Sequence, residues 1–194
     1  MSPYEVVVIG ASWGGLSALT RVLAGLPADF AIPVVIAQHR DVDAEDELLG
    51  TLLARHTPLA VIDADDKAPL ASGTVLLGPP GYHVLVTDEG CAELSVDEPV
   101  QFARPSIDVL FETAADAFGP GAIGVLLTGA NADGAAGLAA IAQRGGYTIV
   151  QDPADAERPE MPRAALASMT PDVVAPLADI AGLLAAACGQ ERAT

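Results

Sequence analysis

Apolar residues follow two spacings along this chain. Continuous apolar runs at 6–9 and 34–37, made mostly of valine and isoleucine, predict strands that are buried on both faces. Between positions 16 and 26, leucines and valines recur every three or four residues, which predicts a helix that buries one side. The chain therefore opens with a strand, a helix and a second strand.

The same alternation continues to the end of the chain. Strands are predicted at 59–62, 75–77, 123–127, 147–150 and 173–174. Helices are predicted over 48–53, from the N-cap Ser106, around 138–141, from near Pro162 and from Ala178. The segments 83–86 and 92–95 flank an Asp-Glu-Gly turn and predict an antiparallel hairpin. We therefore expect an α/β fold in which residues 1–194 form a single domain. Its mostly parallel sheet is doubly wound, with helices on both faces and a short antiparallel hairpin.

Composition narrows the range of functions. The chain is 51% hydrophobic but only 4% aromatic, so its core must consist mainly of aliphatic side chains. The formal net charge is −17 and Lys67 is the only lysine. Binding of nucleic acid or anionic lipid needs clustered cations, so neither is expected. The acidity indicates a solvated, self-repelling surface.

Cys91 and Cys188 lie far apart in the sequence and belong to no disulfide or zinc motif. No basic leader precedes the first strand, and no apolar run reaches the roughly 18 residues of a membrane span. We expect a cytoplasmic protein that does not insert into membranes. The sequence does not indicate its oligomeric state.

Three reactive side chains follow predicted strands: Ser12, His39 and Asp133. Ligands of open α/β sheets bind at the carboxyl ends of the strands, so we expect these three to meet at one edge. A serine nucleophile, a histidine base and an orienting carboxylate would form a hydrolytic triad. Each also has a simpler interpretation, as a helix N-cap, a polar strand end and an Asp-Gly turn respectively.

Ser12 lies in a G-x-S-x-G motif, in which glycines allow a sharp turn that exposes the hydroxyl. The Trp13 amide would then lie at a helix N-terminus and could stabilise an oxyanion. The chain order Ser–His–Asp differs from the Ser–acid–His order of α/β-hydrolases, which disfavours that fold.

Several motifs together resemble the catalytic domain of the CheB-type chemotaxis methylesterases. They run in order along almost the whole chain: residues 8–15, Gln38-His39, residues 79–83, residues 104–111, residues 127–135, Gln151-Asp152 and Met161-Pro162.

This resemblance implies a serine hydrolase that demethylates glutamate γ-methyl esters on chemoreceptor helices and in some cases deamidates glutamines. It implies Ser12 as nucleophile, His39 as base and Asp133 as orienting acid, with no metal and no cofactor. The oxyanion donors would be the Trp13 amide and one amide from the loop of Gly129, Ala130 and Asn131. The implied partner is a methylated receptor or a receptor-like helical protein.

The chain also departs from the family pattern. Trp13 replaces a threonine, Ala130-Asn131 replaces Met-Gly, and Arg40-Asp41-Val42 replaces Met-Pro-Pro. These changes affect the rim of the crevice. Many relatives carry an N-terminal receiver domain, whereas this chain begins at the first catalytic strand, so we expect that switch to be absent.

Two other functions remain open from the sequence. The glycines at 10, 14 and 15 could cradle a dinucleotide, although Gln38-His39 ends the second strand where an acid is usual; Asp41 follows nearby. The second open function is that of a relative of these methylesterases that binds receptors without catalysing a reaction. Arg104 could bind a substrate carboxylate, but a surface ion pair is favoured. His83 is interpreted as a strand residue, and His56 as a cation near the end of its helix.

Overall fold

Seven parallel strands form one sheet in the computed structural model, which describes residues 2–40 and 46–189. The strand order across the sheet is β3-β4-β2-β1-β7-β8-β9. The bounds are β1 Val6–Ala11, β2 Val34–Gln38, β3 Ala60–Asp63, β4 Thr74–Leu77, β7 Ala122–Leu126, β8 Tyr147–Gln151 and β9 Val173–Ala175. The central strands are buried along their whole length, which explains their continuous apolar runs.

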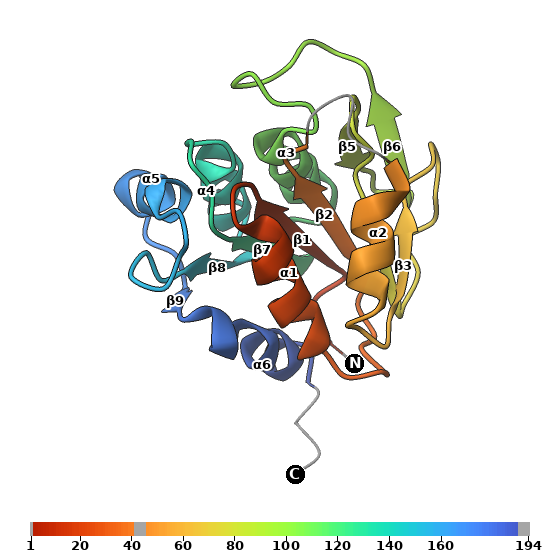
Figure 1. The fold of residues 1–194 in the computed structure, drawn as a ribbon, viewed down its shortest axis with the longest axis horizontal. Helices are drawn as coiled ribbons and strands as arrows, with labels where there is room; N and C mark the ends of the chain where they lie inside the picture. Colours follow the sequence, from red (N-terminus) through yellow and green to blue (C-terminus); the bar gives the residue numbers. More distant parts are fainter. Residues whose placement is uncertain (1, 41–45, 190–194) are drawn as a thin grey trace.

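Helices cover both faces of this sheet (Figure 1). Three helices, α1 (Gly15–Ala24), α2 (Asp46–Ala54) and α6 (Leu177–Ala187), pack on one face. The other face packs against α3 (Ile107–Phe118), α4 (Ala135–Gln143) and α5 (Glu160–Ser168). Two separate aliphatic cores result, as a sheet covered on both sides requires.

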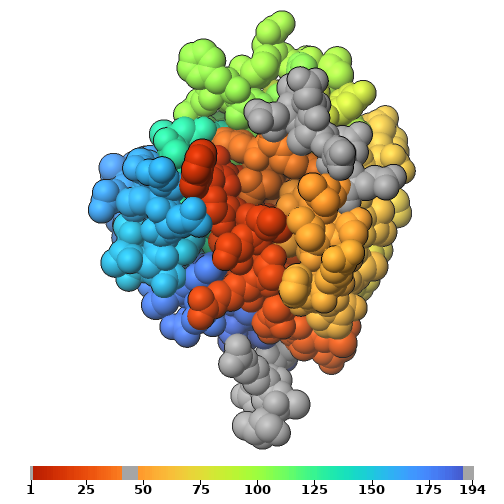
Figure 2. All heavy atoms as spheres, in the orientation of Figure 1, coloured from red at the N-terminus to blue at the C-terminus, as the bar shows by residue number. Residues whose placement is uncertain are grey.

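A two-stranded antiparallel sheet, β5 (His83–Val86) with β6 (Ala92–Ser95), packs beside α3. Residues 96–105 then lead from β6 into α3, and they rise above the carboxyl ends of the strands (Figure 1). The space-filling view shows this loop (green) standing out from the surface (Figure 2).

The predicted fold class is confirmed, and each predicted strand or helix is present with shifts of a few residues. The helix expected near Pro162 begins at Glu160, and Ser106 caps α3 by accepting from the Val109 amide. A short 3-10 turn, Gly119–Gly121, was not predicted. Within the described residues, no helix is long and apolar enough to cross a membrane.

Candidate active site

The turn between β1 and α1 presents Ser12. Gly14 adopts a φ of 78°, a conformation that side chains disfavour, and so lets the chain reverse sharply into α1. The Ser12 amide donates to the Thr128 carbonyl at 3.0 Å, which ties the turn to the loop after β7. This confirms the strand–turn–helix context expected for a G-x-S-x-G serine.

Ser12, His39 and Asp133 lie in one hydrogen-bonded chain. His39 follows β2, which pairs directly with β1, so both side chains lie at the same edge. The His39 Nδ1 is 3.0 Å from Ser12 Oγ, and its Nε2 is 2.6 Å from Asp133 Oδ2. Because an ionised carboxylate only accepts, Nε2 carries the ring proton and Nδ1 is left to accept from the serine hydroxyl.

Asp133 is fully buried, and donors surround its carboxylate. Besides His39, it accepts from the Ser106 hydroxyl at 2.9 Å and from the amides of Ile107 at 2.7 Å and Asp108 at 2.9 Å. Burial raises the pKa of this carboxyl, but the bonds from His39 and the two amides outweigh that effect and hold its pKa below the ordinary value. Asp133 is therefore ionised, as an orienting acid must be.

Asp108 is a buried acid that the sequence analysis did not single out. Its Oδ1 accepts from the amides of Gly134 at 2.9 Å and Gly137 at 2.8 Å, and its Oδ2 accepts from Gln101 Nε2 at 2.8 Å. Burial raises its pKa, the two glycine amides lower it, and the charge of nearby Asp133 raises it further; the net shift is upward. Asp108 thus anchors the start of α4, directly after Asp133.

A second network holds the loop opposite Ser12. The Thr128 hydroxyl accepts from the Arg158 amide at 2.8 Å and lies 3.0 Å from the Trp13 carbonyl, to which it donates. Gln151 accepts from the Thr128 amide at 2.9 Å. Gly129 lies so close that an added Cβ would be 2.9 Å from Ser12 Cβ and closer still to Met161 Sδ. A side chain at position 129 would therefore displace the loop or the nucleophile.

Four backbone amides were expected to include the oxyanion donors, and within the described residues three of them are free to act. The Gly129 amide donates to the Arg158 carbonyl at 3.0 Å, so it is already occupied. The amides of Trp13, Ala130 and Asn131 donate to no acceptor within residues 2–40 and 46–189. Asn131 instead uses its side-chain oxygen to accept from the Asp133 amide at 3.2 Å. These three amides remain available to a bound oxyanion.

A cleft of about 540 Å³ opens above His39. Trp13, Arg104 and Asn131 line it, as do Pro99 and residues 101–103. Trp13 is 59% exposed, and the guanidinium of Arg158 lies 5.3 Å from its ring centroid. Trp13 thus lies at the rim of this cleft, where its substitution for threonine was expected to act.

The prediction that Arg104 forms a surface ion pair is wrong for the described part of the chain. Its guanidinium donates to the carbonyls of Val96 at 2.8 Å and Asp97 at 2.9 Å, and it contacts no carboxylate there. Arg104 thus turns back onto the loop that precedes it, and no sequence pattern indicates which backbone carbonyls an arginine will reach. His83, as expected, is a buried strand residue; it accepts from the Ser106 amide.

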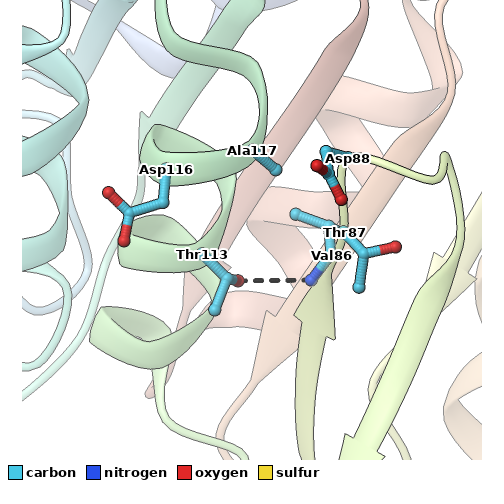
Figure 3. Close-up of a pocket in the computed structure, with 6 residues that line it drawn as sticks. All are labelled: Val86, Thr87, Asp88, Thr113, Asp116 and Ala117. Carbon is cyan, nitrogen blue, oxygen red and sulfur yellow. Dashed lines mark hydrogen bonds between the residues drawn. The ribbon is translucent and has the colours of Figure 1, made fainter.

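A second cavity of about 340 Å³ lies between β5 and α3 (Figure 3). Its polar side chains are the acids Asp88 and Asp116 and the hydroxyls of Thr87 and Thr113. The Thr113 hydroxyl has a structural role, because it accepts a hydrogen bond from the Val86 amide at 3.2 Å (Figure 3). Among the described residues that line this cavity, none form a nucleophile–base pair. In residues 2–40 and 46–189, no three His, Cys, Asp or Glu side chains are grouped so as to hold a metal ion.

The residues expected to form the triad are therefore brought together, whereas the network behind them was missed. The dinucleotide alternative loses support, because the end of β2 carries His39 facing Ser12; Asp41 lies outside the described residues.

Comparison with known proteins agrees with this geometry. The CheB methylesterase family model matches residues 7–184. A Leptospira interrogans protein, whose name describes an inferred protein-glutamate methylesterase/protein-glutamine glutaminase, is 43% identical over 93% of both chains. The protein-glutamate methylesterase FrzG of Myxococcus xanthus is 41% identical over 94% of this chain and 54% of its own length.

The crystal structure of the Thermotoga maritima CheB methylesterase catalytic domain superposes with a TM-score of 0.88. The two share 28% identity, and the match covers 93% of this chain and 97% of that one. The chain belongs to the CheB methylesterase family.

Proposed function

We propose that this protein hydrolyses γ-methyl esters of glutamate residues in a receptor-like protein, with Ser12 as the nucleophile. The observation that carries the proposal is the continuous chain from Ser12 Oγ through His39 to Asp133, with separations of 3.0 and 2.6 Å. The relatives named as protein-glutamate methylesterases support the choice of ester.

In the first step, the Ser12 oxygen attacks the γ-carbonyl carbon while His39 Nδ1 takes the hydroxyl proton. Asp133 stabilises the imidazolium that forms. The carbonyl oxygen becomes an anion within reach of the Trp13 amide and of one free amide from Ala130 or Asn131. The tetrahedral intermediate then collapses, the bond to methoxide breaks, and His39 returns the proton to give methanol.

In the second step, water attacks the glutamyl ester of Ser12, and His39 takes a proton from it. Collapse of the new intermediate releases a glutamate carboxyl and regenerates the serine hydroxyl. A glutamine side chain would follow the same path with ammonia as the leaving group, and the glutaminase names of several relatives support that second activity.

Arg104 is proposed as a substrate contact for two reasons. It lines the cleft, and no described carboxylate forms a salt bridge with its guanidinium. A cytoplasmic location and a methylated receptor as partner remain predictions. The silent-relative alternative is disfavoured, because a non-catalytic binder would need neither the aligned imidazole nor an ionised, buried Asp133.

The test combines labelling with two substitutions. A fluorophosphonate probe should modify Ser12, as mapped by mass spectrometry, and Ser12→Ala should abolish both labelling and release of methanol from a methylated receptor fragment. Asp133→Asn should lower kcat by about 10³- to 10⁴-fold, less than the loss of Ser12. Undiminished methanol release by the Ser12→Ala protein would exclude serine catalysis.

A further inference from the structure

A two-residue turn at the cleft carries residues that its backbone disfavours. Val100 and Ala103 exchange backbone hydrogen bonds of 3.1 and 2.9 Å across the turn. Between them, Gln101 has a φ of 49° and Phe102 a φ of 65°. Positive φ at both central positions is the pattern of a type I′ turn, which strongly favours Asn-Gly. A bulky residue such as Phe at positive φ is a genuine outlier.

Within residues 2–40 and 46–189, burial of the Phe102 side chain does not offset this strain. The side chain of Phe102 is 104% exposed, so it gains no stability from burial. The backbone strain at Phe102 is therefore not offset by burial of its ring. Strain of this kind persists where the surroundings enforce it, and it is concentrated at ligand-binding sites.

The surroundings enforce this turn from both sides. Gln101 Nε2 donates to Asp108 Oδ2 at 2.8 Å, and the Asp108 amide donates to Asp133 Oδ1 at 2.9 Å. On the other side, Arg104 holds the carbonyls of Val96 and Asp97. The turn is thus fixed relative to Asp133, the acid that orients His39, as a substrate contact must be.

Phe102 lines the same cleft as His39 and Trp13. The Trp13 ring is also exposed, and Arg158 restrains it by a cation–π contact. Two aromatic residues, Trp13 from the nucleophile turn and Phe102 from the loop before α3, thus line one cleft with His39.

We propose that Phe102 is a specificity-determining residue, which contacts an apolar side chain of the substrate within one helical turn of the esterified glutamate. This inference rests on the proposed function. Trp13 forms the other side of the same contact. The contact forms equally in the bound substrate and in the transition state, so it affects KM and leaves kcat unchanged.

The test uses two helical peptides that contain one glutamate γ-methyl ester. One has leucine four residues before and four residues after the ester, where side chains share a helix face with it; the other has alanine at both positions. The wild-type protein should prefer the leucine peptide by about tenfold in kcat/KM, the effect of burying part of an aliphatic side chain. Phe102→Ala should remove most of this preference through KM, and Val174→Ala, at an exposed position on β9, should retain it.

Hydrolysis of p-nitrophenyl acetate separates recognition from chemistry, because this small ester lacks the apolar neighbours. Phe102→Ala should lose less activity on it than on the leucine peptide. An unchanged leucine preference in Phe102→Ala would overturn the role of Phe102 alone, and so would an equal loss on every substrate. A wild-type protein that cleaves p-nitrophenyl acetate but neither peptide would instead overturn the proposed function.

Phe102→Gly provides an independent readout. Glycine suits the φ of 65°, so this variant should match Phe102→Ala in its lost preference while its Tm rises by about 2–4 °C over that of Phe102→Ala. A Tm below that of Phe102→Ala would show that the turn is not strained, and would remove the argument for a functional side chain at this position.

Discussion

At the scale of single residues, two buried carboxylates behind His39 divide the work. Asp133 accepts hydrogen bonds from the imidazole N–H and from three further donors, whereas Asp108 accepts hydrogen bonds from the amides of Gly134 and Gly137 at the start of α4. Their pKa values are displaced in opposite directions, downward for Asp133 and upward for Asp108. The group that touches His39 is thereby kept charged, because the donors around it favour its ionised form.

These shifts predict opposite pH dependences of stability. Asp133 stabilises the fold above its unfolded pKa, and this contribution is lost as the pH falls through its lower folded pKa. Asp108 behaves inversely: its contribution is present below its unfolded pKa and is lost as the pH rises through its higher folded pKa. Asp133→Asn should therefore flatten the loss of stability between about pH 5 and pH 3, and Asp108→Asn should steepen it.

Urea unfolding of the wild type and both variants at several pH values in this range measures the two slopes. Each variant serves as the control for the other, because both replace a buried acid with its amide in the same network. Slopes that change in the same direction in both variants would contradict the assignment of opposite shifts.

At the scale of elements, the loop after β7 is built around the absence of a side chain at Gly129. An added Cβ would overlap Met161 and come within 2.9 Å of Ser12 Cβ. We expect Gly129→Ala to lower kcat by about 10²-fold, because displacements near 1 Å at a reacting group have effects of that size.

Gly182, in α6, is the matched control. A Cβ there meets nothing within 4 Å, and helix propensity favours alanine by about 1 kcal/mol. Gly182→Ala should therefore raise Tm and leave the hydrolysis of esters unchanged. Wild-type kcat in Gly129→Ala would show that the loop yields without moving the nucleophile.

At the scale of the whole molecule, the net charge of −17 opposes compaction. Raising NaCl from about 20 mM to about 150 mM shortens the Debye length to about 8 Å and screens this repulsion, so Tm should rise by a few degrees. Calorimetry measures the shift. Replacing exposed acids in the turn of the hairpin, as in Asp88→Asn with Glu89→Gln, should reduce the response. A Tm that falls with salt would indicate that attractive ion pairs dominate the surface.

The sequence predicted the fold well where each segment carries its own pattern. Runs such as Val6–Ala11 are apolar throughout because both faces of a central parallel strand are covered, so the periodicity reports the sheet directly. Ser12, His39 and Asp133 could be selected because each follows a strand, and parallel strands end at one edge.

The contacts behind these residues could not be predicted in this way. Three donors, from Ser106, Ile107 and Asp108, approach Asp133 because α3 packs against the sheet. Gln101 reaches Asp108 from a turn with positive φ angles, which its residue types do not predict. The strand and helix patterns were determined by the sequence itself, since they depend on the spacing of neighbouring side chains. The hydrogen-bond partners, the occupied Gly129 amide and the exposed position of Phe102 were decided by tertiary structure, because each depends on distances between segments far apart along the chain.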